Sequence, residues 1–430
     1  MFQRFRSLAT AAPDATAIIE AGSGRVVTRG ELVGRAQELA RTLREREMVA
    51  VQLPNSAEFV AAVLAILEQR AIGVLIDRDA SEAEVAAIIS QFDLGRPAHP
   101  SLPPDARLIK LTSGSTGKPK GIVTTETNLL ADCASICQTM DIRADDVNFG
   151  AIPLSHSYGF SNLVTPLITR GTALVISNDY LPGSIIDSCN RYRCTVLPGI
   201  PMMFDHLAST DGTDGGFESV RTFISAGAPL PAATSRRFRE RFGSPIHSFY
   251  GCSECGGITY DPRGGAAERG TVGTAVAGVS ITLRATRLVV QSESVALGYL
   301  LEAGHFEPFT RGEFRTDDLA EMRDGEIALI GRASDLINIA GKKVNPREVE
   351  QVILQIDGVR QVKVYGEPAG ARGEVVAAAV VAGPEITHDL VRAFCRERLS
   401  SHKVPRIVKL IERIPVDERG KIRRSALAEL

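Results

Sequence analysis

The sequence contains no apolar run that is long enough to cross a lipid bilayer. The longest run near the N-terminus, residues 59–67, is about half of the roughly 20 residues that a membrane helix requires, and charged residues follow it. The first ten residues include arginines but no apolar stretch of the kind found in secretory signals. We therefore expect no membrane span, and a cytoplasmic location is the simplest interpretation.

Cysteine is scarce and scattered. Seven cysteines in 430 residues cannot all pair, so a disulfide framework is not expected. Cys252 and Cys255 form a CxxC pair, and Cys133 and Cys137 have the spacing of one helix face. Four thiols could hold a zinc ion, but buried thiols are the favoured interpretation, and no metal site is predicted from them.

The sequence also has no large excess of positively or negatively charged residues. The net charge of −2 gives no support to a nucleic-acid partner. A hydrophobic content of 44% and a charged content of 23% are typical of a globular protein, and 430 residues suggest two to three domains. No internal repeat or low-complexity segment is found. The composition thus indicates an ordinary globular protein and leaves its function open.

The apolar periodicity of the first 250 residues alternates between helices and strands. Helical spacing is found at residues 31–45, 56–67 and 81–92. Short apolar runs predict strands at residues 49–53, 72–76, 107–111, 147–153, 172–176, 195–198, 220–225 and 246–250. Such alternation predicts an α/β fold with mainly parallel sheets flanked by helices.

The pattern changes after about Thr259, where smaller antiparallel units are expected, and again near Arg332. A helix is predicted to begin at Pro346, because Asn345 can cap it and Glu348 follows in its first turn. We therefore predict a large N-terminal domain of several subdomains at residues 1–331 and a small α+β domain at residues 332–430.

Glycines, hydroxyls and lysines are concentrated in residues 111–121, directly after the predicted strand 107–111. Backbone N–H groups, hydroxyls and ammonium groups all favour phosphate oxygens, so this loop can hold a polyphosphate. A flexible linker has a similar composition and stays an alternative. The loop is not a Walker A motif, because Pro119 stands where that motif requires Ser or Thr after Lys118.

Four further clusters carry chemistry-bearing side chains. They are residues 153–160 with His156, the small residues 225–230, residues 249–257, and a final set at 314–319, 331–337 and 415–421. The third cluster offers an aromatic face, a hydroxyl and a carboxylate, which suit adenine, phosphate and Mg²⁺. His156 taken alone is better explained as a core histidine.

Taken together and in this order, the five motifs resemble those of the adenylate-forming superfamily of acyl-CoA synthetases, peptide-synthetase adenylation domains and beetle luciferases. The motifs are closest to AMP-forming acyl-CoA synthetases. The resemblance implies that a carboxylate attacks ATP to give an acyl-adenylate and pyrophosphate. A thiol of CoA or of a carrier protein's phosphopantetheine then displaces AMP. It also implies that residues 332–430 are a mobile lid.

The resemblance also implies roles for individual residues. Lys421 would bridge the phosphate and the acyl carboxylate, Glu254 would bind Mg²⁺, and His156 would line the acid pocket with Gly159 and Gly256. Gly341 would lie along the tunnel for the thiol. The positions implied to bind ATP or AMP are Thr112, Ser113, Gly114, Ser115, Thr116, Gly117, Lys118, Gly227, Ala228, Tyr250, Gly251, Ser253, Asp318 and Arg332.

The sequence departs from the family pattern in several places. Asp317 stands where glycine is usual, Ser334 occupies the hinge position that is usually Asp or Lys, and Asn338 replaces a frequent Lys. These differences put the ribose motif and the hinge in doubt. Only 110 residues precede the phosphate loop, so the start of the N-terminal domain looks shortened.

The residues around His156 also bear on the choice of substrate. Adenylation domains for α-amino acids carry an Asp in this motif, and residues 153–158 contain none. This disfavours α-amino acids. The small Gly159, Gly256 and Gly257 and the apolar Phe160 and Ile258 favour an acid with an uncharged aryl or aliphatic tail, and we expect an acid–thiol ligase. A stand-alone adenylation enzyme that loads only a carrier protein, and a nucleotide-binding scaffold without catalysis, are the alternatives.

Overall fold

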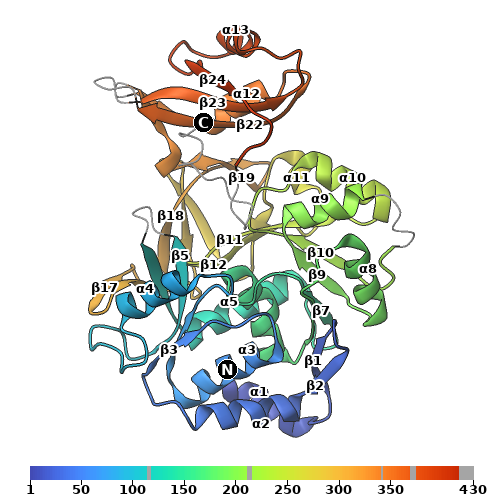
Figure 1. The fold of residues 1–430 in the computed structure, drawn as a ribbon, viewed down its shortest axis with the longest axis vertical. Coiled ribbons are helices and arrows are strands. Elements are labelled where there is room, and N and C mark those ends of the chain that lie inside the picture. Colours follow the sequence, from blue (N-terminus) through green and yellow to red (C-terminus); the bar gives the residue numbers. More distant parts are fainter. Residues whose placement is uncertain (114–117, 211–215, 340–341, 369–373, 416–430) are drawn as a thin grey trace. The chain divides into compact units, whose positions relative to one another are not determined.

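The computed structural model describes residues 1–113, 118–210, 216–339, 342–368 and 374–415 (Figure 1). The chain divides into two compact units. The first contains Met1–Thr282, Val289–Phe314 and Asp324–Ile327, and the second contains Leu283–Leu288, Arg315–Arg323 and the chain from Ala328 onward. The last division lies close to the boundary that we predict after residue 331, but the second unit also takes two earlier segments. The boundary at residue 331 therefore stays a prediction.

A nine-stranded sheet forms the larger framework of the first unit. Its order is β13-β12-β11-β10-β9-β7-β8-β1-β2. Its strands are β1 (Thr16–Glu20), β2 (Arg25–Thr28), β7 (Val147–Gly150), β8 (Ala173–Ile176), β9 (Val196–Gly199), β10 (Thr222–Ser225), β11 (Ile246–Cys252), β12 (Gly256–Tyr260) and β13 (Thr274–Ala275). Neighbours from β11 through to β1 are parallel, and the pairs at the two ends are antiparallel. The predicted mainly parallel sheet is confirmed here.

A six-stranded sheet of the same unit has the order β17-β16-β6-β5-β4-β3. Its strands are β3 (Met48–Val51), β4 (Ile72–Leu75), β5 (Ala106–Ser113), β6 (Pro119–Thr125), β16 (Gly298–Glu302) and β17 (His305–Pro308). β3, β4 and β5 are parallel, whereas β5–β6, β6–β16 and β16–β17 are antiparallel. This sheet is therefore mixed, and its antiparallel half carries the glycine-rich loop.

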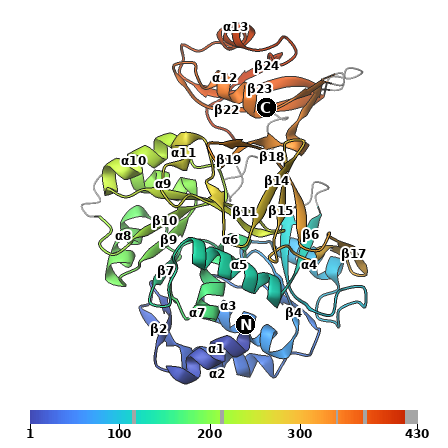
Figure 2. The same cartoon turned by 180° about the vertical axis from the view of Figure 1, so that it is seen from behind.

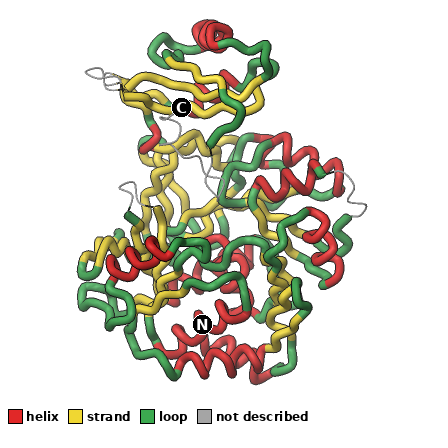
Figure 3. The backbone as a smooth tube through the Cα atoms, in the orientation of Figure 1, coloured by secondary structure: helices red, strands yellow, loops and turns green. Residues whose placement is uncertain are grey.

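Helices pack against these sheets. They are α1 (Phe2–Ala11), α2 (Arg29–Ala40), α3 (Ala57–Gln69), α4 (Glu82–Phe92), α5 (Glu126–Thr139), α6 (Ser157–Gly159), the π-helical turn η1 (Phe160–Val164), α7 (Thr165–Arg170), α8 (Pro182–Arg191), α9 (Pro201–Ser209), α10 (Ala232–Phe242) and α11 (Ala266–Arg269). Figure 2 shows α5 from behind, and Figure 3 shows the helices beside the strands. Within the described ranges, no helix has both the length and the apolarity for a bilayer span.

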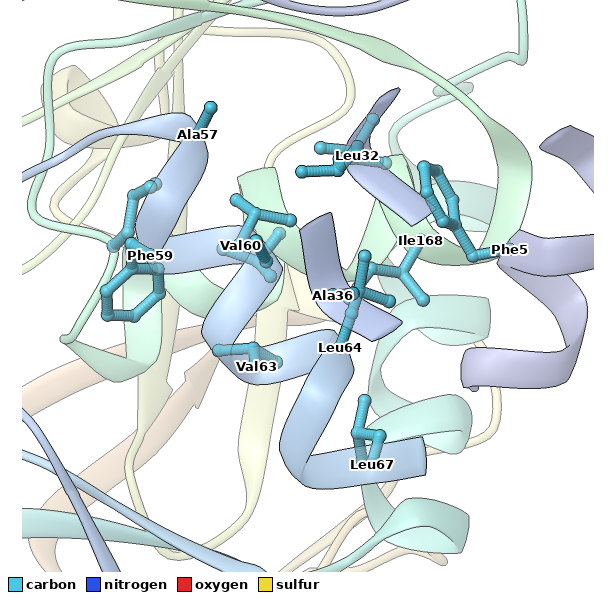
Figure 4. Close-up of a cluster of buried hydrophobic side chains, with 14 of the residues drawn as sticks. Phe5, Leu32, Ala36, Ala57, Phe59, Val60, Val63, Leu64, Leu67 and Ile168 are labelled. Carbon is cyan, nitrogen blue, oxygen red and sulfur yellow. The ribbon is translucent and has the colours of Figure 1, made fainter. Parts of the chain in front are cut away.

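The N-terminal helices share one apolar core, in which α1, α2 and α3 meet the α7 region (Figure 4). Phe5, Leu32, Ala36 and Leu64 are at most 1% exposed. Burying a large apolar side chain contributes about 1.5–3 kcal/mol, so this cluster is a main source of stability for the first unit. α2 begins with a capping box in which Thr28 accepts from the backbone N–H of Glu31.

The helix predicted at residues 31–45 begins two residues earlier and ends at Ala40. After Ala40, the N–H of Leu43 bonds to the carbonyl of Ala40, which is the tighter i→i−3 pattern. The Thr42 hydroxyl also donates to the carbonyl of Leu39 and competes with helical bonding. Apolar periodicity alone does not show this local competition.

A four-stranded sheet follows in the chain, with the order β14-β15-β18-β19. Its strands are β14 (Ser280–Arg284), β15 (Arg287–Gln291), β18 (Glu313–Arg323) and β19 (Glu326–Arg332). β14 and β15, with five residues each, agree with the predicted change to smaller units after Thr259, whereas β18 has eleven residues.

The remainder of the second unit is an α+β body. It contains the 3₁₀ turn η2 (Ala333–Asp335), the β20 (Ile337–Ile339)–β21 (Lys342–Val344) ribbon, α12 (Pro346–Ile353), α13 (His388–Arg398) and a three-stranded sheet of β22 (Val359–Pro368), β23 (Glu374–Ala382) and β24 (Ile407–Leu410). Val349, Ile353, Val380 and Cys395 belong to one buried cluster between these elements. Asn345 caps α12 by accepting from the N–H of Arg347, as its sequence predicts.

Candidate active site

The glycine-rich loop joins two antiparallel strands. Thr112 at the end of β5 pairs with Lys120 at the start of β6, so the loop is the turn of a hairpin. The loop follows a strand end, as predicted: β5 is parallel to β4 on one side, and on its other side the chain returns antiparallel as β6. Lys118 is exposed at the start of the returning strand. Gly114, Ser115, Thr116, Gly117 and the side chain of Ser113 lie outside the described residues.

Gly121 in this motif has a packing role. A Cβ at this position would lie 2.6 Å from Cγ2 of Ile109 and 3.4 Å from the carbonyl oxygen of Leu300. The side chain of Ile109 on the paired strand β5 therefore requires the small residue. The last glycine of the motif is explained by the sheet and does not need a phosphate ligand to account for it.

A second hairpin carries the implied phosphate and metal ligands. β11 ends at Cys252, β12 begins at Gly256, and these two residues pair across the hairpin. Ser253 and Glu254 therefore lie in the turn between the strands, both half-buried. The backbone carbonyl of Glu254 accepts from the N–H of Ala296 at 2.8 Å, which ties the turn to the segment before β16.

The Glu254 side chain has a partner that sequence analysis did not identify. The hydroxyl of Tyr299 donates to Glu254 Oε1 at 2.8 Å. Nζ of Lys120 lies 5.1 Å from the centroid of the Tyr299 ring. Tyr299 therefore links the carboxylate on the second hairpin to the hairpin of the glycine-rich loop.

Tyr299 keeps its proton over the physiological pH range. Burial raises the pKa of its hydroxyl, and the charge of Glu254 raises that pKa further. An ionised tyrosine could not donate to a carboxylate, so the raised pKa maintains the hydrogen bond. The Glu254 carboxylate is thereby held by a neutral donor and retains acceptor capacity for a cation.

One carboxylate in this position fits Mg²⁺. This ion usually takes one or two protein carboxylates and completes its coordination with water and substrate phosphates. Among the described residues, no group of three or more His, Cys, Asp and Glu side chains is arranged to hold a metal ion. The donor set therefore suits a nucleotide-borne Mg²⁺ at Glu254 and gives no support to a zinc site from the cysteines.

The motif with His156 meets the second hairpin directly. The hydroxyl of Ser157 donates to Oγ of Ser253 at 2.8 Å. The hydroxyl of Tyr158 donates to the carbonyl of Ile224 at 3.0 Å, at the end of β10. Two motifs separated by about a hundred residues are thus in contact. A π-helical turn follows at once, and such turns are frequent at functional sites.

His156 is not a core histidine. Its side chain is 32% exposed, and its Nε2 lies 3.2 Å from Oδ2 of Asp77. Asp77 follows β4 and has a side chain that is 17% exposed. An ionised carboxylate only accepts hydrogen bonds, so this contact requires a proton on Nε2 of His156. In the neutral ring, Nδ1 is then the unprotonated nitrogen. Sequence analysis missed Asp77, because it lies far from the motif in the chain.

The two glycines implied to line the acid pocket both have packing reasons. A Cβ on Gly159 would lie 2.1 Å from the carbonyl oxygen of Pro153, and one on Gly256 would lie 2.2 Å from Oδ1 of Asp132. Gly256 also has a φ of +71°, which disfavours other residues. Their small size therefore does not by itself indicate a ligand, and their place in the pocket stays a prediction.

Asp132 on α5 is a second residue that sequence analysis missed. It is 4% exposed. Its Oδ1 accepts from the N–H of Gly257 at 2.8 Å, and its Oδ2 accepts from the hydroxyl of Ser161 at 2.5 Å. One buried carboxylate thus anchors the hairpin after Glu254 and the helix after His156.

The positions implied for adenine lie at the ends of adjacent parallel strands. β10 ends at Ser225, two residues before Gly227, and β11 carries Tyr250 and Gly251 near its end. Gly227 has a φ of +87° and requires glycine for that reason, and Ala228 follows it as an exposed residue. Carboxyl ends of parallel strands are where α/β sheets bind ligands, which suits the implied role.

The second unit contains the implied ribose ligands. Nε of Arg332 lies 3.0 Å from Oδ1 of Asp318, and the Asp318 side chain is 14% exposed. The N–H of Asp318 donates to the hydroxyl of Thr316. The implied pair is therefore in contact. Gly341 and Lys421 lie outside the described residues, so their roles stay predictions.

Two of the departures from the family pattern are partners of each other. The hydroxyl of Ser334 donates to the carboxylate of Asp317, and the N–H of Ser334 lies 3.2 Å from Oδ1 of Asp317. Arg287 adds an ion pair to Asp317 at 3.5 Å. The unusual Asp at the ribose motif thus compensates for the unusual Ser at the hinge, and neither change leaves a polar group unsatisfied.

Comparison with known proteins agrees with this geometry. Residues 5–96 and 92–305 match the AMP-binding enzyme family, and residues 348–421 match the AMP-binding enzyme C-terminal domain. A feruloyl-CoA synthase of Amycolatopsis sp is 29% identical, with 87% of this chain and 77% of the relative covered. The long-chain-fatty-acid–CoA ligase FadD13 of Mycobacterium tuberculosis is 26% identical, with 99% and 97% covered.

Solved structures give the same result. The ATP-bound MatB of Rhodopseudomonas palustris superposes with a TM-score of 0.85 at 25% identity, covering 100% of this chain and 98% of that one. The o-succinylbenzoate CoA synthetase MenE of Bacillus subtilis, in complex with its acyl-adenylate, superposes with a TM-score of 0.83 at 24% identity, covering 99% and 97%. The chain therefore belongs to the AMP-binding enzyme family, and it is an AMP-forming ligase that activates a carboxylic acid and passes it to a thiol.

Proposed function

We propose that the enzyme activates a carboxylic acid with an uncharged aryl or aliphatic tail and transfers the acyl group to CoA. The observation that supports the proposal most directly is the contact between Ser157 and Ser253, since Ser157 follows His156 and Ser253 precedes Glu254 in the chain. Relatives named for aryl and long-chain aliphatic CoA ligases support both substrate classes. The loading of a carrier protein instead of CoA is the second candidate.

In the proposed adenylation step, a carboxylate oxygen of the acid attacks the α-phosphorus of ATP, and the bond to the pyrophosphate oxygen breaks. Ser253 would donate to the α-phosphate, and Glu254 would hold Mg²⁺, which neutralises phosphate charge when bound. Thr112, Lys118 and the loop between them would hold the leaving pyrophosphate. Tyr299 would keep Glu254 oriented during this step.

The remaining residues would bind and position the nucleotide. Tyr250, Gly227 and Ala228 would contact adenine, and Asp318 with Arg332 would contact the ribose. Lys421 would stabilise the charge that builds on the α-phosphoryl group, and Gly341 would border the path of the thiol. We propose a cytoplasmic location, which the seven free thiols support, because oxidising compartments favour disulfides.

The acid class is tested by pyrophosphate exchange across a panel of aryl, short aliphatic and long aliphatic acids. We expect exchange with one uncharged class and no exchange with free α-amino acids. Thioester formation is then measured with CoA and with a phosphopantetheinylated carrier protein at equal concentration. Transfer to the carrier alone would exclude CoA as the acceptor, and no exchange with any acid would contradict the proposal.

Replacement of Asp77 by Asn is expected to raise the KM for the acid about 3- to 10-fold with little change in the KM for ATP. The substitution weakens a charge-assisted hydrogen bond that orients His156, which costs about 1 kcal/mol. Steady-state kinetics with each substrate varied in turn give the two constants. Asp79→Asn is the matched control, because Asp79 has a 60% exposed side chain and pairs with Arg78. Equal changes for acid and ATP would argue against a role in the acid pocket.

A further inference from the structure

The CxxC pair encloses the two residues implied to bind phosphate and Mg²⁺. Cys252 is the last residue of β11, Cys255 is the last residue of the turn, and only Ser253 and Glu254 separate them. The two Sγ atoms are 3.1 Å apart. A disulfide bond is about 2.05 Å long, so about 1 Å of movement would join them.

A second thiol pair, on α5, differs in its backbone. Cys133 and Cys137 lie on successive turns of α5, with their Sγ atoms 3.8 Å apart. Both are within a regular helix of 14 residues, where hydrogen bonds fix the separation of positions i and i+4. Cys252 and Cys255 lie instead at a hairpin turn, where a smaller movement closes the gap. Of these two pairs, Cys252 and Cys255 therefore have the geometry that is closer to a disulfide bond.

The two thiols differ in solvent exposure, and this suggests different roles in an oxidation. Cys255 is fully buried, and its carbonyl accepts from the hydroxyl of Ser294 at 2.7 Å. Cys252 is partly exposed. Cys252 is thus the more accessible residue to a small oxidant, although the hydrogen bond with Cys255, burial and the charge of Glu254 raise the pKa of its thiol and slow the reaction. Cys255 is the neighbouring thiol that resolves the product.

We propose that Cys252 and Cys255 are a modification site at which a peroxide forms an intramolecular disulfide, and that this disulfide lowers the adenylation rate by moving the Ser253–Glu254 turn. The effect on the rate rests on the proposed role of Glu254. The Glu254 carboxylate depends on its hydrogen bond to Tyr299. Drawing the ends of the turn together shifts Glu254 away from that donor, while the formation of the disulfide itself depends only on the two sulfurs.

The chemistry balances with the peroxide as the oxidant. The Cys252 sulfur attacks one peroxide oxygen, the O–O bond breaks, and the products are a sulfenic acid and one water. The Cys255 sulfur then attacks the sulfenic sulfur, the S–S bond forms, and the hydroxyl leaves as a second water with the remaining thiol proton. The two thiols lose two electrons in total, and hydrogen peroxide takes them up.

The test treats the full-length enzyme with hydrogen peroxide, blocks free thiols with an alkylating reagent and identifies linked peptides by mass spectrometry. Pyrophosphate exchange is measured on the same samples. We expect a 252–255 linked peptide, a loss of exchange of at least 10-fold, and recovery with dithiothreitol. The Cys133→Ser/Cys137→Ser double variant should behave as the unmodified chain does, and the Cys252→Ser/Cys255→Ser double variant should keep its activity in peroxide.

Two results would overturn the proposal. One is the absence of a 252–255 linked peptide at peroxide concentrations that oxidise other thiols, and the other is a linked enzyme with unchanged exchange. Should the double serine variant fail to fold, the single Cys255→Ala variant replaces it, because it removes the resolving thiol alone. The mass-spectrometric result is independent of catalysis, so an enzyme without exchange activity in its reduced state would contradict the proposed function and still test the modification site.

Discussion

Replacement of Lys421 by Ala is expected to lower the rate of acyl-adenylate formation by about 10²- to 10³-fold. The reason is electrostatic: negative charge develops on the α-phosphoryl group as the acid attacks, and one well-placed cation or donor is worth about 3–4 kcal/mol in such a site. Thioester formation from supplied acyl-adenylate should change little, because that step does not build charge at the same position. Exchange assays and single-turnover thioester assays measure the two steps separately.

The matched control for Lys421 is a bulky substitution at Gly341. Gly341→Leu should leave adenylate formation near its normal rate and slow thioester formation, since it would narrow the path of the thiol. The two variants thus affect opposite halves of the reaction. Equal losses in both steps for Lys421→Ala would contradict a residue that acts in adenylation alone.

Replacement of Glu254 by Gln is expected to lower adenylation by about 10²-fold or more and to raise the Mg²⁺ concentration needed for half-maximal rate. The amide keeps the size of the side chain and removes the charge that a hard cation requires. Magnesium titrations of the exchange rate measure both effects. Glu293→Gln is a suitable control, because that side chain is exposed on the surface. An unchanged magnesium requirement would contradict the assignment of Glu254 as a ligand.

The Tyr299→Phe variant tests whether the orientation of the Glu254 carboxylate matters separately from its proposed binding of Mg²⁺. The variant retains Glu254 but loses the hydrogen bond of 2.8 Å to its Oε1. Loss of one hydrogen bond to a charged group costs about 1.5–3 kcal/mol, so a rate reduction of roughly 10-fold or more is expected, partly restored by excess Mg²⁺. A merely structural role for Tyr299 would change thermal stability without changing the magnesium dependence.

The sequence predicted the parts of this molecule that depend on local pattern. Alternating apolar runs predicted the parallel strands of the nine-stranded sheet, and the Asn345–Pro346 start of α12 was confirmed by its capping hydrogen bond. The five motifs placed the family correctly, since each is a short stretch whose residue types reflect the chemistry. The shift to short strands after Thr259 was visible for the same reason.

The parts that could not be predicted depend on contacts between distant segments. Asp77 and His156 are 79 residues apart in the chain, and Glu254 and Tyr299 are 45 apart. A single sequence gives no register between such segments, so neither partner could be assigned. The antiparallel return of the chain after the glycine-rich loop could not be predicted for a related reason, because a strand does not show in its own residues whether its neighbour runs parallel.

The pair of Asp317 and Ser334 shows how a departure from a pattern can mislead. Each residue taken alone raised doubt about its motif, yet the Ser334 hydroxyl and the Asp317 carboxylate satisfy each other. A compensating pair appears as two separate defects when motifs are judged one at a time. Only the structure of the second unit shows that they form one interaction.

Asp132 has a consequence for attempts to engineer a new substrate preference. Because its two oxygens separately hold Gly257 and Ser161, the segment with His156 and the hairpin with Glu254 share one anchor on α5. A grafted segment would have to bring its donors to this α5 carboxylate in the same geometry, namely the backbone N–H at position 257 and a hydroxyl at position 161. Exchange of residues 153–161 or 249–257 between relatives should therefore succeed more often when α5 is transferred with them as a single module.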